Sequence, residues 1–246
     1  MTGAERYGAA GALGTPRLHL RSTDSTNVRA RELATSGAPH GTLVTAGEQS
    51  AGRGRQGRTW SASPGRALLC SLLLRNPPAL LPLIAGVAVA EAATAVARSE
   101  EAGFSDAKLK WPNDVLISGR KVAGILVEGR PQESWAVVGI GINVALREQD
   151  FPPELRSVAG TLGREPDAIE PTLERLLAVL ERWLAADWST VLAEVRSRDA
   201  LLGQPVRWAQ GDGIAAGIDD DGQLLVDTGG RRVALNAGEV HLLARV

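Results

Sequence analysis

The sequence predicts an α+β fold in which a mixed β-sheet with helices is followed by a small β-barrel. Apolar, β-branched runs alternate with helical patterns as far as residue 199. Beyond about residue 200 the chain becomes five short strand patterns separated by Gly and Asp turns. Such strands can close on themselves, although they could also extend the first sheet. We therefore expect a flexible tail at 1–16, a large domain at 17–199 and a small barrel at 200–246.

The large domain begins with a strand, a helix and a second strand. Residues 17–22 read as a strand, and Asp24 or Ser25 caps a helix that stops at Gly37. Further strands are expected at 42–49, 66–75, 107–117, 121–129 and 134–144. Helices are expected at 80–98 and 171–188, with a loop at 147–166 between them. The barrel strands are expected at 205–210, 213–219, 223–228, 231–237 and 239–246.

The composition argues against a general nucleic-acid binder and against an exported protein. Lysine and arginine number 27 against 28 acidic side chains, so the net charge of −1 attracts no polyanion. The one cysteine, Cys70, lies in an apolar run, which favours a buried core thiol in a reducing compartment. The N-terminus lacks the apolar segment of a signal peptide. The apolar stretch 79–97 contains Pro82 and Glu91, so it reads as a buried helix rather than a membrane span. We expect a cytoplasmic protein.

Residues 51–60, AGRGRQGRTW, which we call the arginine loop, contain the letters G-x-G-x-x-G of a dinucleotide-binding turn. That turn requires a helix after the glycines and an acidic residue about 20 positions further on. Residues 58–65 lack helical periodicity and end in Pro-Gly, and 66–82 contain no Asp or Glu. The dinucleotide interpretation therefore fails.

The arginine loop instead predicts an anion-binding site. Glycine lets the backbone approach a ligand closely, and the guanidinium groups of Arg53, Arg55 and Arg58 suit carboxylate or phosphate. The alternative is a solvated basic loop on the surface.

Other polar residues flank strands further along the chain. KWPND (110–114) leaves Asn113 and Asp114 beside a strand start, although Pro-Asn-Asp is also ordinary turn chemistry. Lys121 opens an otherwise apolar strand and taken alone reads as a surface lysine, and Asn143 follows glycines that indicate a close backbone approach. The chain has no Walker A motif and no H-E-x-x-H or paired-cysteine metal motif.

Four stretches occur in the order in which one enzyme family carries them. GRGRQGRTW, KWPNDV, KVAGILVEG and GIGINV resemble the motifs of biotin protein ligases, the biotin–[acetyl-CoA-carboxylase] ligases, and DSTN (24–27) and AGEV (237–240) add to the match. The resemblance spans about residues 18–246. It implies a catalytic domain related to class II aminoacyl-tRNA synthetases, followed by an SH3-like barrel.

The resemblance also implies the reaction. The family makes biotinyl-5′-AMP from biotin and ATP with Mg²⁺, releases pyrophosphate and passes biotin to a lysine of a biotin carboxyl carrier domain. No permanently bound cofactor and no membrane partner are expected.

Roles for individual residues follow from the same resemblance. The biotin site would comprise Ser25, Thr26, Asn27, Gln49, Arg53, Gly54, Arg55, Lys121, Gly124 and Ile125. The ATP and adenylate site would comprise Arg53, Arg55, Arg58, Trp60, Asn113, Lys121 and Asn143, with Asn143 at the adenine. The catalytic residues would be Arg53, Lys121 and Asp114, and the metal ligands are not identified.

The chain departs from the family pattern in two ways. Gln56 replaces an arginine that some members carry, which leaves one cation fewer in the loop. Some members also carry an N-terminal helix-turn-helix and act as repressors, whereas about 16 residues precede the first strand here, so we expect no operator binding. Monomer and weak homodimer both stay open.

The chemistry explains the residue types. The biotin carboxylate is ionised at pH 7, so the first step requires cations that offset its repulsion from ATP rather than a base. The acceptor lysine must lose a proton in the second step, and Asp114 could accept or orient it. Three alternatives compete: a lipoate–protein ligase, which should lack the arginine loop; a biotin or nucleotide sensor without turnover; and a repressor, which length and charge disfavour.

Overall fold

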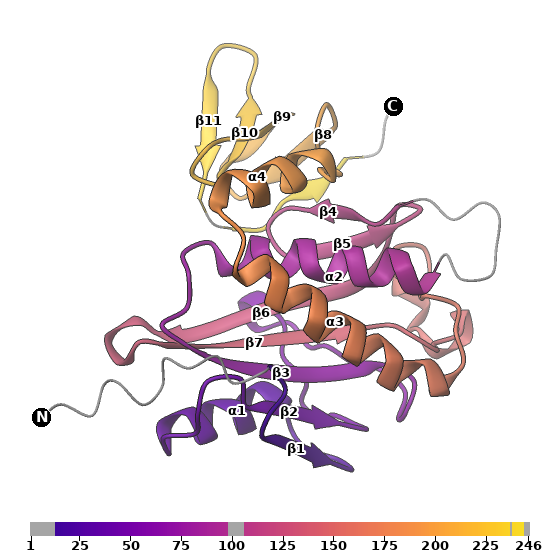
Figure 1. Cartoon of the computed structure of the whole chain (residues 1–246). Helices are drawn as coiled ribbons and strands as arrows, with labels where there is room; N and C mark the ends of the chain where they lie inside the picture. Colours follow the sequence, from indigo (N-terminus) through magenta and orange to yellow (C-terminus); the bar gives the residue numbers. More distant parts are fainter. Residues whose placement is uncertain (1–12, 98–105, 237, 244–246) are drawn as a thin grey trace, which may run out of the picture.

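A seven-stranded sheet lies at the centre of the computed structural model, which describes residues 13–97, 106–236 and 238–243. Its strands are β1 (Arg17–Leu20), β2 (Leu43–Ala46), β3 (Leu68–Arg75), β4 (Lys108–Lys110), β5 (Asp114–Ile117), β6 (Arg120–Arg130) and β7 (Trp135–Ile142). They lie in the order β1-β2-β3-β7-β6-β5-β4 (Figure 1). β1 and β2 pair in parallel, and the other neighbours pair antiparallel. The sheet is mixed, as the sequence predicts.

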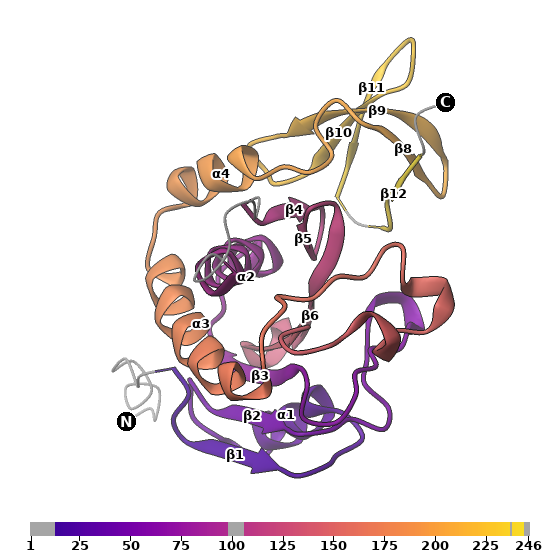
Figure 2. The same cartoon turned by 90° about the vertical axis from the view of Figure 1, so that its right-hand side faces the viewer.

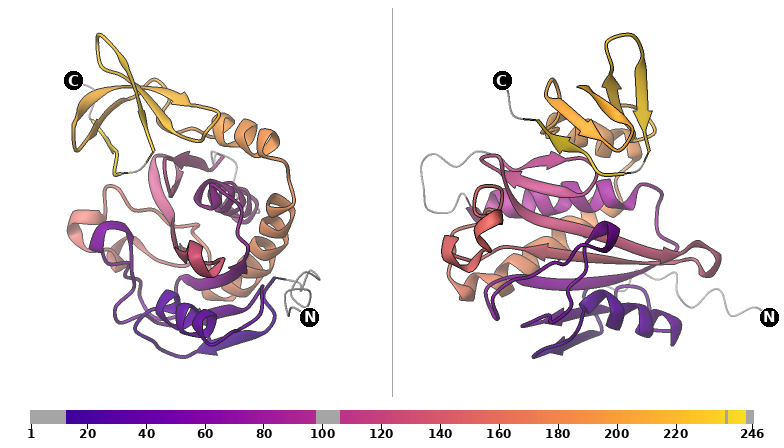
Figure 3. Two further views of the ribbon diagram at one scale, coloured as in Figure 1. Left: turned by 90° about the vertical axis from the view of Figure 1, so that its left-hand side faces the viewer. Right: turned by 180° about the vertical axis from the view of Figure 1, so that it is seen from behind.

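Helices cover both faces of this sheet. α1 (Thr26–Thr35) packs on one face against β3 and β7, whereas α2 (Leu81–Ala97) and α3 (Ile169–Leu184) pack together on the other (Figure 3). Figure 2 views α2 almost end-on, beside α3 and α4 (Trp188–Ser197). Because α2 is enclosed, most of its residues are buried, which is the environment that a predominantly apolar helix requires. No helix in the described residues is long and apolar enough to cross a bilayer.

Strand β3 divides the core between the two faces. Leu72 and Leu74 join the core under α2 and α3, whereas Leu73 joins a smaller cluster under α1. Successive side chains of a strand point to opposite faces, so Ser71 shares the α1 side with Leu73. Ser71 is completely buried, and a buried hydroxyl needs a hydrogen-bond partner. The fold thus sets a polar group beneath α1.

The C-terminal residues form a second sheet of antiparallel strands. These are β8 (Pro205–Trp208), β9 (Gly211–Ile218), β10 (Leu224–Asp227), β11 (Arg232–Leu235) and β12 (His241–Leu242), in the order β11-β10-β9-β8-β12. Val206, Leu224 and Val226 are fully buried within it. In the part of the chain that the structure describes, β11 and β12 do not pair with each other, so closure of a barrel is not seen there.

Side chains of the large domain attach the second sheet. The indole nitrogen of Trp111 donates to Gly222 O at 3.0 Å, and that of Trp188 donates to Asp220 O at 2.8 Å. Arg196 Nε donates to Ile218 O, at the end of β9, at 2.8 Å. These three hydrogen bonds hold the C-terminal sheet beside the turn between β4 and β5.

The helix predicted at 171–188 corresponds to α3, and a second helix, α4, follows it at a place where the sequence predicts none. α3 ends at Leu184, and Asp187 caps α4 by accepting a hydrogen bond from the Thr190 amide at 2.9 Å. The leucine periodicity runs up to this break and gives no sign of it. The strand predicted at 107–117 is divided into β4 and β5 by the Trp-Pro-Asn turn. Short 3-10 turns lie at Arg55–Gly57, Pro131–Glu133, Glu148–Asp150, Pro153–Leu155 and Pro166–Ala168.

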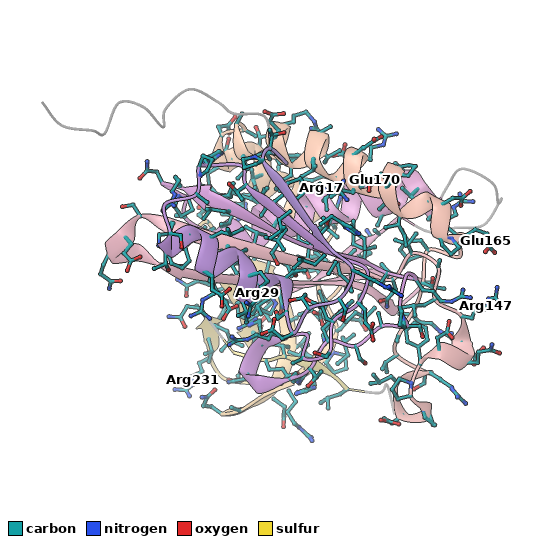
Figure 4. All side chains as sticks on the ribbon, turned by 90° about the horizontal axis from the view of Figure 1, so that it is seen from below. Arg17, Arg29, Arg147, Glu165, Glu170 and Arg231 are labelled. Atoms are coloured by element: carbon teal, nitrogen blue, oxygen red, sulfur yellow. The ribbon has the colours of Figure 1, made fainter. Side chains whose placement is uncertain are left out.

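Most of the predicted tail, residues 1–12, lies outside the described residues. Gly14, which the sequence also assigns to the tail, donates from its amide to Gly41 O at 2.9 Å. Arg17 of β1 forms an ion pair with Glu170 of α3, with Arg17 Nη2 3.0 Å from Glu170 Oε2, and Figure 4 shows these side chains directed toward each other. The outermost strand is thereby attached to the helix layer.

Candidate active site

A cleft lies on the α1 side of the central sheet, with β6 and β7 as its floor. The arginine loop forms one side, the β4–β5 turn forms another, and residues 238–240 reach its rim from the C-terminal sheet. All the predicted site residues except Asn143 line this cleft. The fold therefore gathers stretches that are far apart in the sequence, while the role of each residue stays a prediction.

Neutral hydrogen-bonding groups gather at the first turn of α1. Gln49 Oε1 accepts hydrogen bonds from the Thr26 amide at 2.7 Å and from Thr26 Oγ1 at 3.0 Å. Ser71 Oγ lies 2.6 Å from Asn27 Oδ1 and 2.8 Å from Thr26 Oγ1. Ser25 occupies the N-cap position of α1, as the sequence predicts, but its side chain makes no capping hydrogen bond. Uncharged donors and acceptors of this kind suit an uncharged polar ring.

Three glycines expose the backbone of the cleft floor. A Cβ at Gly139 would lie 2.0 Å from Asn27 Oδ1, and one at Gly141 would lie 2.5 Å from Trp60 Cε2. A Cβ at Gly124, the register partner of Gly141, would lie 2.9 Å from the Trp60 ring. The Asn27 amide and the Trp60 indole thus rest directly on bare backbone. The sequence predicts a close approach at these glycines, and the structure shows that the protein's own side chains make it.

Cations line the opposite part of the cleft. Lys121 Nζ lies 2.6 Å from Asp114 Oδ1 and 5.5 Å from the centroid of the Trp60 ring. Arg55 Nη1 donates to Asn113 Oδ1 at 3.1 Å. Burial lowers the pKa of the Arg55 guanidinium, and the Asp114 carboxylate opposes that shift. Lys121 and Arg55 therefore contact Asp114 and Asn113, two residues that the sequence assigns to the same site.

The other two arginines of the loop pair with carboxylates from distant elements. Arg53 Nη2 lies 3.2 Å from Glu128 Oε1 on β6. Arg58 forms an ion pair with Glu239, which precedes β12 of the C-terminal sheet. Carboxylates of the protein thus contact both arginines, at the positions where the anionic groups of a ligand are predicted to bind.

Two charged residues in the cleft have no role predicted from the sequence. Lys110 lines the cleft, where burial lowers the pKa of its ammonium group; the Asp114 carboxylate raises that pKa, and Lys121 and Arg58 lower it further. Glu239 lines the rim and holds Arg58. Lys110 belongs to KWPND and Glu239 to AGEV, two stretches that carry the family resemblance. Membership of these motifs is the sequence feature that could have identified both residues as part of the site.

Asn143 is the predicted site residue that does not line the cleft. Its side chain is 4% exposed and donates from Nδ2 to Gly160 O at 2.8 Å and to Lys121 O at 3.5 Å. The amide ties the loop that follows β7 to the start of β6. The structure thus shows a packing role for Asn143, and its contact with adenine stays a prediction.

Cys70 is a buried core thiol, as the sequence predicts. Burial raises the pKa of its thiol to about 12, so it carries no nucleophilic thiolate near neutral pH. Within the described residues, no group of three or more His, Cys, Asp and Glu side chains is placed to hold a metal ion.

Two family models match the chain. Residues 19–144 match the biotin/lipoate A/B protein ligase family, and residues 201–243 match the biotin protein ligase C-terminal domain. The two matched ranges coincide with most of the central sheet and with the C-terminal sheet.

Individual relatives agree with the family models. The bifunctional ligase/repressor BirA of Bacillus subtilis is 37% identical over 225 residues, which cover 83% of this chain and 67% of the relative. The biotin–[acetyl-CoA-carboxylase] ligase of Mycobacterium tuberculosis is 36% identical over 240 residues, which cover 91% of this chain and 88% of the relative. The solved structure of biotin protein ligase from Aquifex aeolicus in complex with biotin and ATP has a TM-score of 0.79 at 30% identity, and the match covers 93% of this chain and 99% of that one. The fold expected from the sequence, with an SH3-like C-terminal domain, is confirmed.

Proposed function

The chain belongs to the biotin/lipoate A/B protein ligase family, as a biotin protein ligase, and from this premise we propose how its cleft acts. In the first step the biotin carboxylate attacks the α-phosphate of ATP, pyrophosphate leaves and biotinyl-5′-AMP forms. In the second step a lysine amine of a biotin carboxyl carrier domain attacks the acyl carbon, AMP leaves and the amine loses its proton. The products are a biotinylated carrier, AMP and pyrophosphate.

The observation that carries this proposal is that one glycine-floored cleft has a neutral polar end and a cationic end. The neutral end contains Thr26, Asn27 and Gln49, whose hydroxyl and amide groups suit the ureido ring of biotin. The cationic end contains Arg55 and Lys121, which suit carboxylate and phosphate groups. A molecule with a neutral ring at one end and a carboxylate at the other spans both.

The first step is electrostatic. Biotin's carboxylate is an anion at pH 7 and must approach the polyanion ATP. Arg53, Arg55 and Lys121 lie in the cleft as fixed cations, and they would offset this repulsion and the charge that develops at the α-phosphate. The same side chains would hold the biotin carboxylate in line with the α-phosphate, and this positioning would lower the activation barrier of the first step.

Magnesium would enter this cleft with ATP. Mg²⁺ keeps several waters and takes one or two protein carboxylates together with substrate phosphates. The carboxylates that line the described cleft are Asp114 and Glu239, which pair with Lys121 and Arg58, so either would have to exchange that partner to hold the ion. Bound there, the ion would neutralise phosphate charge, while this chain's own cations bind and orient the carboxylate.

The second step requires a deprotonated amine. Asp114 lies at the cleft wall, 2.6 Å from Lys121 Nζ, and we assign it to accept or orient the proton of the incoming lysine. The arginine loop forms one side of the cleft and, once ordered over the bound adenylate, would keep water away from it.

The test is pyrophosphate release from ATP and Mg²⁺ with and without biotin, followed by addition of a carrier domain. Biotin-dependent release and then biotin on the carrier lysine are the expected results. Release with lipoate and none with biotin would keep the fold and change the substrate. Release with neither would leave a binding protein rather than a ligase.

Two related expectations belong to the same proposal. A single buried cysteine suits a reducing compartment, so we assign the enzyme to the cytoplasm, where fractionation can test it. DNA binding is a separate question, because some relatives are bifunctional ligase/repressors. A gel-shift assay with a biotin operon promoter addresses it directly.

A further inference from the structure

Asp24 is the one residue of the DSTN stretch (24–27) to which the proposed function gives no role. The three residues that follow it line the cleft, whereas Asp24 does not. It lies between β1 and α1, directly before the N-cap residue Ser25. Any effect of Asp24 on a ligand must therefore pass through the residues that it holds.

The Asp24 carboxylate joins its own segment to α1. Asp24 Oδ1 accepts hydrogen bonds from the Ser25 amide at 2.7 Å and from Thr23 Oγ1 at 2.9 Å. Asp24 Oδ2 accepts one from Arg29 Nη2 of α1 at 2.9 Å. These contacts hold the pKa of the Asp24 carboxyl below its ordinary value, and the hydrogen bond from the Ser25 amide is the largest cause. The ionised group accepts hydrogen bonds only, so it fixes the Ser25 amide in one direction.

The backbone around Asp24 is also joined to the chain before the arginine loop. Thr23 O accepts a hydrogen bond from the Ser50 amide at 2.9 Å. Gln49, the neighbour of Ser50, accepts from the Thr26 amide at 2.7 Å. The two stretches that carry the predicted contacts to the biotin ring, 25–27 and Gln49, are therefore connected on both sides of Asp24.

Ser25 does not spend its hydroxyl on the helix that it begins. An N-cap serine ordinarily accepts a hydrogen bond from an amide two or three residues further on. Ser25 makes no such bond, although its backbone has the extended conformation of an N-cap, with φ −156° and ψ 133°. Ser25 lines the cleft and is only 2% exposed. Asp24 thus fixes the backbone of Ser25 while the Ser25 hydroxyl is left for the cleft.

We propose that Asp24 is a positioning residue, whose carboxylate fixes the start of α1 so that the Ser25 hydroxyl and Thr26 are held in place to bind the ring of biotin. The inference rests on the proposed function for its kinetic consequence. Groups that are fixed in advance lose less entropy when a ligand binds. Asp24 therefore acts on the affinity for biotin and not on ATP binding or the chemical step.

The first test measures amide hydrogen exchange, resolved by NMR, in the protein alone. Asp24→Ala removes the acceptor of the Ser25 amide, whereas the acceptors of the Thr26 and Ser50 amides remain. If Asp24 holds this whole region, exchange should accelerate about three- to thirtyfold at all three amides, the range that the loss of a helix cap produces.

Asp187→Ala is the matched control. Asp187 caps α4 by accepting the Thr190 amide at 2.9 Å, and it does not line the cleft. Its removal costs a cap of the same kind at another place in the fold. Exchange at Ser25 and Thr26 should stay as in wild type.

The second test separates positioning from loss of stability. In Asp24→Ala the KM for biotin in pyrophosphate release should rise about three- to thirtyfold, with kcat and the KM for ATP within about twofold of wild type. Asp24→Asn keeps an acceptor for the Ser25 amide and loses only the ion pair with Arg29, which is partly exposed and contributes little. It should therefore bring the KM for biotin back to within about threefold of wild type. Asp187→Ala should leave that KM unchanged.

The outcomes distinguish the inference from the proposed function. Unchanged exchange at Thr26 and Ser50 in Asp24→Ala, or equal acceleration there in Asp187→Ala, would overturn the inference whatever the substrate. A lowered kcat with an unchanged KM for biotin would also overturn it, as would a KM in Asp24→Asn as high as in Asp24→Ala. If wild-type protein released no pyrophosphate with biotin, the proposed function would fail, and the exchange experiment would still decide whether Asp24 holds the start of α1.

Discussion

The substitution Gly139→Ala tests the neutral end of the cleft with one carbon atom. The added Cβ would lie 2.0 Å from Asn27 Oδ1, so the amide would have to move by about 1 Å or more to reach ordinary contact. Asn27 is held by Ser71 at 2.6 Å, by Glu128 at 2.9 Å and by Leu126 O at 3.3 Å. A neutral hydrogen bond contributes about 1 kcal/mol and one to a charged group about 2 kcal/mol, so the displacement costs roughly 2–4 kcal/mol.

We expect this cost to appear in biotin binding. Each 1.4 kcal/mol is about a tenfold change in Kd, so isothermal titration should show biotin affinity lowered at least about tenfold in Gly139→Ala. Gly230→Ala, where a Cβ meets nothing within 4 Å, is the matched control and should bind as wild type does. The double variant Gly139→Ala/Asn27→Ala removes the clashing oxygen and should regain thermal stability without regaining affinity. Wild-type affinity in Gly139→Ala would refute the steric argument, and recovery of affinity in the double variant would refute the role of Asn27.

Further expectations concern charge, the nucleotide and pH. Arg53→Ala and Lys121→Ala should each slow biotin-dependent pyrophosphate release at least about a hundredfold with an unchanged circular dichroism spectrum, and normal rates would contradict the assigned roles. Gly141→Ala, whose Cβ would lie 2.5 Å from the Trp60 ring, should displace the indole and raise the KM for ATP, and an unchanged KM would count against an ATP-binding role for Trp60. Burial raises the pKa of Cys70 from 9.0 to about 12, so above pH 9 the unfolded chain loses a proton that the native protein keeps. The free energy of unfolding should therefore fall by up to about 1.4 kcal/mol per pH unit between pH 9 and 12. Urea unfolding at pH 8 and pH 10 should show that extra slope in wild type but not in Cys70→Ala; equal slopes would refute it.

Three cations of the cleft have carboxylate partners within the described residues. Lys121 pairs with Asp114, Arg53 with Glu128 and Arg58 with Glu239. Clustered like charges repel strongly when they are partly buried, and nearby carboxylates reduce that cost. An anionic ligand must displace these carboxylates from the cations in order to bind. This competition favours ligands with several anionic groups over a ligand with a single carboxylate.

Contiguous motifs could be interpreted from the sequence because residue types within a short stretch already state their chemistry. The arginine loop sets three guanidinium groups among glycines, and no tertiary information is needed to infer an anion partner. KWPND similarly predicts a turn with an amide and a carboxylate at a strand start, and Asp114 does begin β5. The alternation of strand and helix patterns was enough for the mixed sheet, whereas the break before α4 was hidden because Asp187 resembles any solvent-facing residue of an amphipathic helix.

Partners that come from different strands were decided by the tertiary structure alone. Ser71 reads as one polar residue in an apolar run, and Glu128 as the end of a strand, yet they lie on either side of Asn27. Their meeting depends on the strand order β3-β7-β6, since β7 contributes only a glycine at the point where the amide crosses it. The sequence by itself determined which residues can bind anions or hydrogen-bond a polar ring. Strand order and the alternation of side chains determined which of those residues face one another, because pairing between strands is set by contacts between residues that are distant along the chain.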